Sequence, residues 1–192
     1  MEDALAFGGA CISLLNYADR VKAACLAQLV NVIAPIMTEK GGPAWRQTIF
    51  HPFAQMSRFG RGRSLRLQVE CETYAATYYD PRGAQDLYFP IPSVPFLKMA
   101  AVADERTGGL SLFLLNRDLE GPMDVSIAAR GFDGLAVAEA LQLHHPDLQA
   151  ANSKNAPERI QPTPLEVAVD GTRIDLTLPP ASWAVVSLAP PS

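Results

Sequence analysis

The first 62 residues carry the hydrophobic patterns of helices and of one buried strand. Near the N-terminus, apolar residues recur at spacings of three and four, which predicts a helix with an apolar face formed by Ala4, Phe7, Cys11, Leu14 and Leu15. Residues 21–29 are predicted to form a second short helix, and residues 44–59 a third helix that ends at Gly60. Residues 30–37 are mostly apolar, which is typical of a parallel strand covered on both faces.

This order of helix, buried strand, loop and helix is the repeating unit of α/β barrels and open α/β sheets. A complete eightfold barrel takes about 250 residues, so residues 1–62 are predicted to form only the edge of an incomplete (β/α)8 barrel. Pro52 is expected to kink the third helix or to limit it to one side. The exposed apolar surface of such an edge should promote self-association, and removal of residues 1–60 is expected to improve solubility.

From residue 63 onward the hydrophobic period changes to two. Apolar and polar residues alternate from residue 65 to residue 70, and strand-like runs follow at residues 100–104, 110–116, 125–127, 135–143, 167–169, 174–178 and 183–188. Turn residues at 106–109 and at Asp170-Gly171 predict hairpins. We therefore expect an antiparallel β-sandwich over residues 63–192.

The same pattern predicts which side chains fill the sandwich and where its long loops lie. Residues 83–95 and 152–164 are rich in proline, alanine and polar residues, so both are predicted to be long loops. The side chains expected to be largely buried are those of Leu65, Leu67, Val69, Leu112, Leu114, Leu176, Leu178 and Trp183.

Composition and charge exclude several classes of protein. The chain is 48% hydrophobic and 19% charged, which excludes disorder as its dominant state. Its net charge of −4 argues against nucleic-acid binding. An acidic N-terminus and an interrupted apolar stretch at residues 23–37 predict neither a secretory signal nor a membrane span, so a cytoplasmic protein is expected. Its three cysteines form no metal-binding pattern, and no cofactor is expected.

Few residues offer candidate chemistry. His144 and His145 are adjacent, so on a strand they point to opposite faces, and we interpret them as strand-end histidines at a solvated edge. Glu39 follows the predicted buried strand, where barrels carry catalytic groups, but a solvated exit from the strand is the favoured interpretation. Residues 45–47 are Trp-Arg-Gln, in which an indole face and hydrogen-bonding groups can contact a sugar, although a Trp at a helix start more often packs. Trp183 is interpreted as a core residue rather than a lectin platform.

Two blocks of sequence carry a family resemblance. Residues 27–36 read AQLVNVIAPI, and residues 42–53 read GPAWRQTIFHPF. These blocks closely resemble the late part of the α-L-arabinofuranosidases of glycoside hydrolase family 51, as do EDAL (2–5), ADRV (18–21), LLNRDL (114–119) and LPPASWAV (178–185). The resemblance covers nearly the whole chain and is weakest over residues 74–95.

The resemblance implies a (β/α)8 barrel that carries the chemistry and a C-terminal β-sandwich that packs against it. Members hydrolyse terminal non-reducing α-L-arabinofuranosyl residues by a retaining mechanism, with one glutamate as acid/base and another as nucleophile. The acid/base lies in an Asn-Glu pair after the fourth barrel strand, and the nucleophile follows the seventh. This sequence contains no Asn-Glu pair, and Met1 corresponds to a position just after the nucleophile's loop. Both catalytic glutamates are therefore expected outside these 192 residues, and Glu39 matches neither.

One substrate-binding residue carries over from the family to this chain. Gln47 corresponds to the active-site glutamine after the eighth strand, which hydrogen-bonds the arabinofuranosyl unit. The resemblance divides the chain into a barrel remnant, residues 1–62, and a sandwich domain, residues 63–192, and the isolated chain is expected to be inactive. Family members are commonly hexamers, so a homo-oligomer is expected. The alternative interpretation is a stand-alone β-sandwich that acts as a carbohydrate-binding or interaction module.

Overall fold

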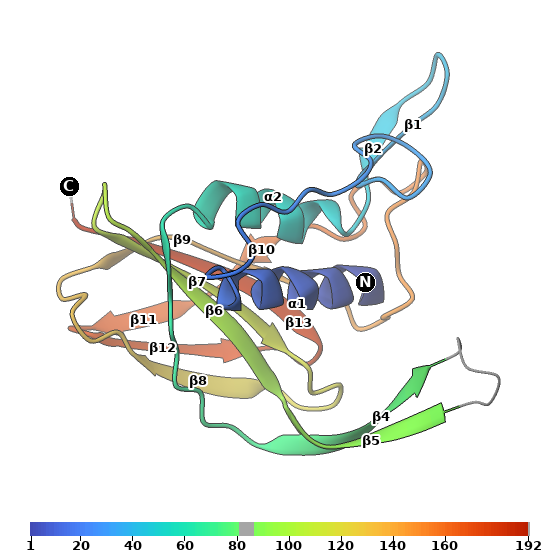
Figure 1. Cartoon of the computed structure of the whole chain (residues 1–192). Helices are drawn as coiled ribbons and strands as arrows, with labels where there is room; N and C mark the ends of the chain where they lie inside the picture. Colours follow the sequence, from blue (N-terminus) through green and yellow to red (C-terminus); the bar gives the residue numbers. More distant parts are fainter. Residues whose placement is uncertain (81–86, 192) are drawn as a thin grey trace.

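The computed structural model describes residues 1–80 and 87–191, and within them the chain forms a β-sandwich with two helices on one face (Figure 1). The sandwich consists of two sheets. Within each sheet, neighbouring strands are antiparallel, which confirms the predicted antiparallel sandwich. The larger sheet has the strand order β10 (Thr163–Pro164), β9 (Ala136–Leu143), β13 (Ser182–Ala189), β7 (Gly109–Asn116), β6 (Leu97–Asp104) and β3 (Arg63–Leu65). The smaller sheet has the order β11 (Val167–Asp170), β12 (Arg173–Leu178) and β8 (Met123–Ala128).

Both predicted hairpins form, and glycine makes each turn possible. Strands β6 and β7 pair from Leu97 opposite Asn116 to Asp104 opposite Gly109, and Gly108 in their turn has a φ of +72°. Strands β11 and β12 turn at Gly171, which has a φ of +57°. Residues other than glycine rarely adopt these left-handed backbone conformations, so glycine at both positions favours the observed registers.

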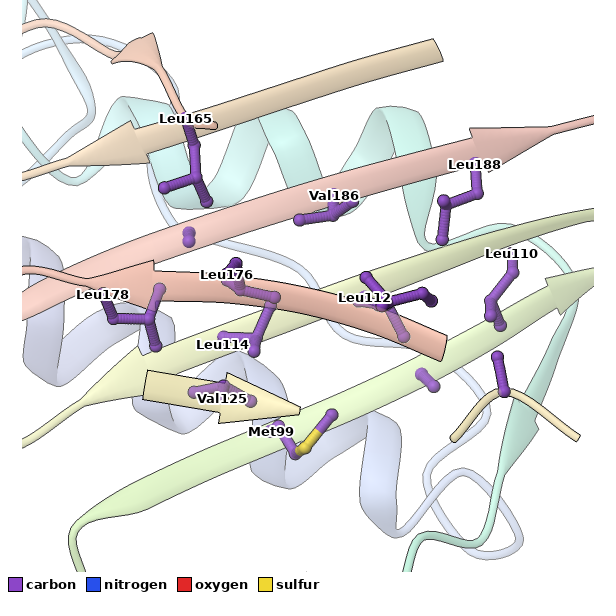
Figure 2. Close-up of a cluster of buried hydrophobic side chains, with 14 of the residues drawn as sticks. Met99, Leu110, Leu112, Leu114, Val125, Leu165, Leu176, Leu178, Val186 and Leu188 are labelled. Atoms are coloured by element: carbon purple, nitrogen blue, oxygen red, sulfur yellow. The ribbon is translucent and has the colours of Figure 1, made fainter. Parts of the chain in front are cut away.

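The space between the two sheets is filled by aliphatic side chains, as the period-two pattern predicts. Figure 2 shows leucines of β7 and β12 facing one another across this space. The predicted burial is confirmed for the following five residues: Leu112, Leu114, Leu176, Leu178 and Trp183. Leu65 and Leu67 are half-buried against the same cluster. Val69 is 39% exposed, so its predicted burial is wrong. The reason is that β3 ends at Leu65 and residues 66–72 form no regular structure.

The opposite face of the six-stranded sheet is covered by the two helices, α1 (Glu2–Asn16) and α2 (Phe50–Phe59). Ile12 of α1 packs in one buried cluster with Phe113 and Trp183 of the sheet. The helix approaches closely, since a Cβ added at Gly8 would lie 2.6 Å from Cε3 of Trp183. The indole Nε1 of Trp183 donates a buried hydrogen bond of 2.6 Å to Oε1 of Gln55 in α2. Trp183 is thus buried, as predicted, but on the helix-covered face of the larger sheet rather than between the two sheets, and it joins the sheet to both helices.

The predicted N-terminal helix is confirmed, but its buried face is not the predicted one throughout, because Leu14 is 39% exposed and Ile12 is fully buried. The segment after the helix also differs from the prediction. Residues 21–29 form no helix, and the predicted strand over residues 30–37 is reduced to β1 (Ile36–Thr38) with one bridge between Val30 and Ile36. A buried parallel strand needs neighbours on both edges, and among the described residues β1 forms a ladder only with β2 (Ala44–Arg46), in an antiparallel hairpin. Val32 and Ile33 are therefore 81% and 70% exposed.

The third predicted helix starts later than expected. Residues 44–46 belong to β2, and α2 begins only at Phe50. Pro52 lies in the first turn of α2, where a missing N–H leaves no helical hydrogen bond unmade, so the expected kink has no cause. The helix ends at Phe59 with Gly60 as its C-cap, as the sequence predicts.

A further hairpin lies where a loop was predicted. Strand β4 (Thr73–Asp80) pairs with β5 (Leu87–Pro95), so residues 87–95 are a strand, and the remaining part of the predicted loop, residues 83–86, lies outside the described residues. Figure 1 shows this ribbon extending away from the sandwich. Its prolines are compatible with a two-stranded ribbon, because each strand has one edge without ladder partners. The other predicted loop, residues 152–164, is irregular except for the short strand β10.

Candidate functional site

Gln47 lies in the short connection between β2 and α2, and hydrogen bonds hold its backbone on both sides. Its N–H donates to the carbonyl oxygen of Pro35 over 2.8 Å, and its own carbonyl oxygen accepts the N–H of Phe50 over 3.0 Å. The residue is half-buried, so the side chain retains access to solvent. A primary amide in this position can both donate and accept hydrogen bonds, which suits a pair of neighbouring sugar hydroxyls.

The segment preceding Gln47 is closed by Asn31. The N–H of Asn31 donates to the carbonyl of Ile36 over 2.8 Å, and its Oδ1 accepts the N–H of Thr38 over 2.7 Å. Its Nδ2 donates to Oγ1 of Thr38 over 2.9 Å. Asn31 has a φ of +64°, a left-handed conformation that asparagine tolerates better than most residues. Asn31 therefore supports the local turn that leads into the β1–β2 hairpin.

Glu39 follows β1 and points into an exposed ion pair rather than toward a second carboxylate. Its Oε2 lies 2.6 Å from Nζ of Lys154, and both side chains are largely exposed. Exposed pairs of this kind contribute about 0–1 kcal/mol to stability. The interpretation of Glu39 as a solvated residue at the strand exit is confirmed.

Trp45 and Arg46 contribute mainly to local packing. Trp45 stands opposite Met37 in the β1–β2 hairpin and is half-buried, and its indole Nε1 has no partner among the described residues. The guanidinium carbon of Arg46 lies 4.8 Å from the centre of the Phe50 ring, within the range of a cation–π interaction. Arg46 thus contacts the start of α2, Trp45 lies within the β1–β2 hairpin, and Gln47 follows them directly.

The three histidines occupy two regions. His144 and His145 come directly after the end of β9, as predicted, but both are half-buried rather than fully solvated. Nδ1 of His145 accepts the N–H of Asp147 over 3.0 Å. His51 lies in the first turn of α2 and is only 7% exposed. Burial of the ring, followed by the positive charge of Arg46, lowers the pKa of His51 below its usual value of 6.5.

We expect the buried His51 to make the stability of the chain depend on pH. Its pKa is lower in the folded chain, so the unfolded chain binds the proton more readily once the pH falls below about 6.5. This contribution to stability is complete above that value and is lost as the pH decreases toward the folded-state pKa. Urea unfolding at pH 7.5, 6.5 and 5.5 measures it, and His51→Gln should have a smaller pH dependence. An identical dependence in the variant would contradict this assignment.

Two grooves on the part of the chain that the structure describes lie away from Gln47. One groove of about 890 Å³ lies between the end of α1 and β3, and another of about 1110 Å³ lies along β8, β12 and β11. Gln47 lines neither groove. In the described residues, no group of three or more His, Cys, Asp or Glu side chains is arranged to hold a metal ion. No helix in residues 1–80 or 87–191 is long and apolar enough to cross a membrane.

The fold and this site define a β-sandwich domain that carries, on its helical face, a short α/β segment with a candidate sugar-binding glutamine. Residues 1–182 match the family described as the α-L-arabinofuranosidase C-terminal domain. The chain belongs to this family.

Similar proteins with assigned names support membership of this family. The chain is 43% identical to an intracellular exo-α-(1→5)-L-arabinofuranosidase of Streptomyces lividans, over 99% of this chain and 27% of that protein. It is 39% identical to intracellular exo-α-(1→5)-L-arabinofuranosidase 1 of Bacillus subtilis, over 97% of this chain and 35% of that protein. An exo-α-(1→6)-L-arabinofuranosidase of Bifidobacterium longum is 40% identical, over 96% of this chain and 34% of that protein.

Solved structures match as well. A family 51 α-L-arabinofuranosidase of Bifidobacterium longum superimposes with a TM-score of 0.83 at 36% identity, and the match covers 98% of this chain and 34% of that one. An arabinose complex of the Thermotoga maritima enzyme gives a TM-score of 0.82 at 27% identity, over 97% of this chain and 38% of that one. The chain therefore spans 27–38% of the length of these relatives.

Sequence reasoning missed the asparagines that hold the Gln47 segment. Asn31 and Asn152 both use their side-chain amides to bind backbone groups near this segment. Asn31 could have been suspected, because it interrupts an apolar run and asparagine is common in turns. Asn152 lies 105 positions after Gln47, and the hydrophobic pattern carries no signal that connects the two.

Proposed function

We propose that this chain forms the C-terminal part of an α-L-arabinofuranosidase that removes terminal non-reducing α-L-arabinofuranosyl residues. In this proposal the retaining reaction uses two glutamates outside the chain, and Gln47 hydrogen-bonds the arabinofuranosyl unit. The single observation that carries the proposal is the match of residues 1–182 to the C-terminal domain family. The half-buried position of Gln47, with its backbone held on both sides, supports its role.

The proposal extends to the organisation and setting of the complete enzyme. Residues 1–62 would supply the last part of its barrel and residues 63–192 its sandwich domain. Relatives named intracellular support a cytoplasmic location, and the family resemblance supports a homo-oligomer. The substrate would be an arabinose-containing oligosaccharide or polysaccharide. Relatives that cleave (1→5) and (1→6) linkages are 43% and 40% identical to the chain, so we assign the sugar unit and leave the linkage open.

A chimeric enzyme tests the proposal. This chain replaces the matching segment of the Streptomyces lividans relative, to which it is 43% identical. We expect the chimera to hydrolyse an aryl α-L-arabinofuranoside. Gln47→Ala should reduce its kcat/KM about five- to thirtyfold, because one or two hydrogen bonds of about 1 kcal/mol each are lost.

The matched control is Gln68→Ala, which removes an exposed glutamine that bonds only to Glu70 among the contacts of the described residues. Its kcat/KM should remain unchanged. A folded chimera that is inactive would contradict the proposed function. Equal activity of the Gln47→Ala variant and the parent chimera would contradict the role of Gln47 alone.

A further inference from the structure

Asn152 is a buried asparagine whose side-chain amide both donates and accepts hydrogen bonds to backbone groups. It lies in the loop between β9 and β10 and is 4% exposed. Its Nδ2 donates to the carbonyl oxygens of Arg46 and Ile160, each over 3.0 Å, and its Oδ1 accepts the N–H of Ile160 over 2.8 Å. One side chain of the sandwich domain thus binds the backbone directly before Gln47.

The bond to Arg46 completes a clamp on a single peptide unit. The carbonyl oxygen of Arg46 and the N–H of Gln47 belong to the same peptide group. Asn152 holds the carbonyl oxygen, and the carbonyl of Pro35 holds the N–H over 2.8 Å. A planar peptide held at both polar atoms has little freedom to rotate. The direction in which the side chain of Gln47 leaves the backbone is fixed by that orientation.

The loop that carries Asn152 is itself anchored at several points. Ile160 is buried in the cluster under the helices, and the guanidinium of Arg159 lies 3.2 Å from a carboxylate oxygen of Asp147. Lys154 reaches the β1–β2 hairpin through its ion pair with Glu39. These contacts hold the backbone of the loop that carries Asn152, and the two hydrogen bonds with Ile160 set the direction of the Asn152 amide.

We propose that Asn152 is a positioning residue for Gln47, through which the sandwich domain orients the sugar-binding amide. This inference rests on the proposed function of Gln47 for its catalytic consequence, but the clamp itself is a property of this chain. Loss of Asn152 frees the Arg46–Gln47 peptide and weakens the sugar contact without removing any group that touches the sugar.

The first experiment tests the clamp in the 192-residue chain by amide hydrogen exchange. In Asn152→Ala, the N–H of Gln47 should exchange at least tenfold faster, relative to amides of β7 and β13 in the same sample. Asn152→Asp is the second variant, because it loses both donors but keeps an acceptor for the N–H of Ile160. Asn152→Asp should also speed the exchange of the Gln47 N–H at least tenfold, so it provides the test if the alanine variant does not fold.

Asn116 provides a matched control. It is also a buried asparagine, its Nδ2 donates to the carbonyls of Gly121 and Pro179, and its Oδ1 accepts the N–H of Asp118. None of these partners lies in residues 31–51. Asn116→Ala should lower overall stability but leave the relative exchange rate of Gln47 unchanged. An equal change at Gln47 in both variants, or no change in either, would overturn the inference.

The second experiment tests the functional consequence in the chimeric enzyme by a double-mutant cycle. Asn152→Ala should lower kcat/KM about tenfold in the parent chimera but less than twofold when Gln47 is already alanine, because it acts through Gln47. A merely structural role would lower kcat/KM to the same extent in the parent chimera and in the Gln47→Ala chimera, and this outcome would overturn the inference. An effect of Gln47→Ala with no effect of Asn152→Ala would also overturn it while leaving the proposed function intact. The exchange experiment decides the clamp even if the chimera has no activity.

Discussion

Removal of residues 1–60 should abolish cooperative folding of the β-sandwich. The deletion takes away both helices and uncovers a sheet face that includes Phe113, Trp183 and Val185, which are fully buried in the intact chain. Burial of such side chains contributes about 1.5–3 kcal/mol each, up to roughly 5–9 kcal/mol for the three. This is comparable to the whole free energy of unfolding of a typical domain, about 5–15 kcal/mol. Thermal unfolding followed by circular dichroism, together with size-exclusion chromatography, provides the measurement.

The control concerns the apolar residues that are exposed in the intact chain. Substitution of Leu29, Val32 and Ile33 by polar residues removes apolar surface without disturbing the core, since all three are exposed. We expect these substitutions to reduce self-association and to change the free energy of unfolding by less than about 0.5 kcal/mol each. A truncated chain that remains monomeric and unfolds cooperatively would contradict the role assigned to the helices.

The isolated 192-residue chain should not hydrolyse an aryl α-L-arabinofuranoside. Retaining hydrolysis needs two carboxyl groups about 5–5.5 Å apart on either side of the bond that breaks. Between Asp19 and Glu70 the only acidic residue of the sequence is Glu39, and its carboxylate is paired with Lys154 at 2.6 Å. Gln47 alone supplies about 1 kcal/mol per hydrogen bond, which is too little to hold a sugar. The rate of release of the aryl group should therefore equal the rate in buffer without protein.

The sandwich could be predicted from the sequence because its strands have a clear period of two. Alternation places Leu112 and Leu114 on one face of their strand and Leu176 and Leu178 on one face of theirs, and these two faces meet between the sheets. The Asp170-Gly171 turn sets the register of the β11–β12 hairpin. The β4–β5 hairpin was missed because its second strand contains three prolines, which are rare in strands outside edges.

The segment before the sandwich was harder to predict because its hydrophobic residues have partners that a local pattern does not identify. The first helix is predicted correctly, but its apolar face was assigned to a barrel edge, whereas Ala4 of that face packs in one buried cluster with Trp183 and Phe113 of the sandwich. This is why the expectation that truncation improves solubility is now reversed. The apolar run at residues 30–37 resembles a buried strand by composition alone, and hydrogen-bonding partners on both edges would be needed to form one.

The candidate site was accessible to sequence reasoning only in part. The residue types at positions 45–47 indicate only a general capacity for sugar contact, and the specific role of Gln47 is implied by the family resemblance. The support from Asn152 depends on a tertiary contact between residues 106 positions apart. Spacing along the chain contains no information on such a contact, so a structure was needed to identify it.

The most direct test of the account compares two proteins in one assay on an aryl α-L-arabinofuranoside. One is the isolated chain, and the other is the same chain joined to the preceding part of the Streptomyces lividans relative. We predict turnover by the joined protein, sensitive to Gln47→Ala, and none by the isolated chain. Turnover by the isolated chain that disappears in Glu39→Gln would contradict the account, because the chain would then carry its own catalytic carboxylate.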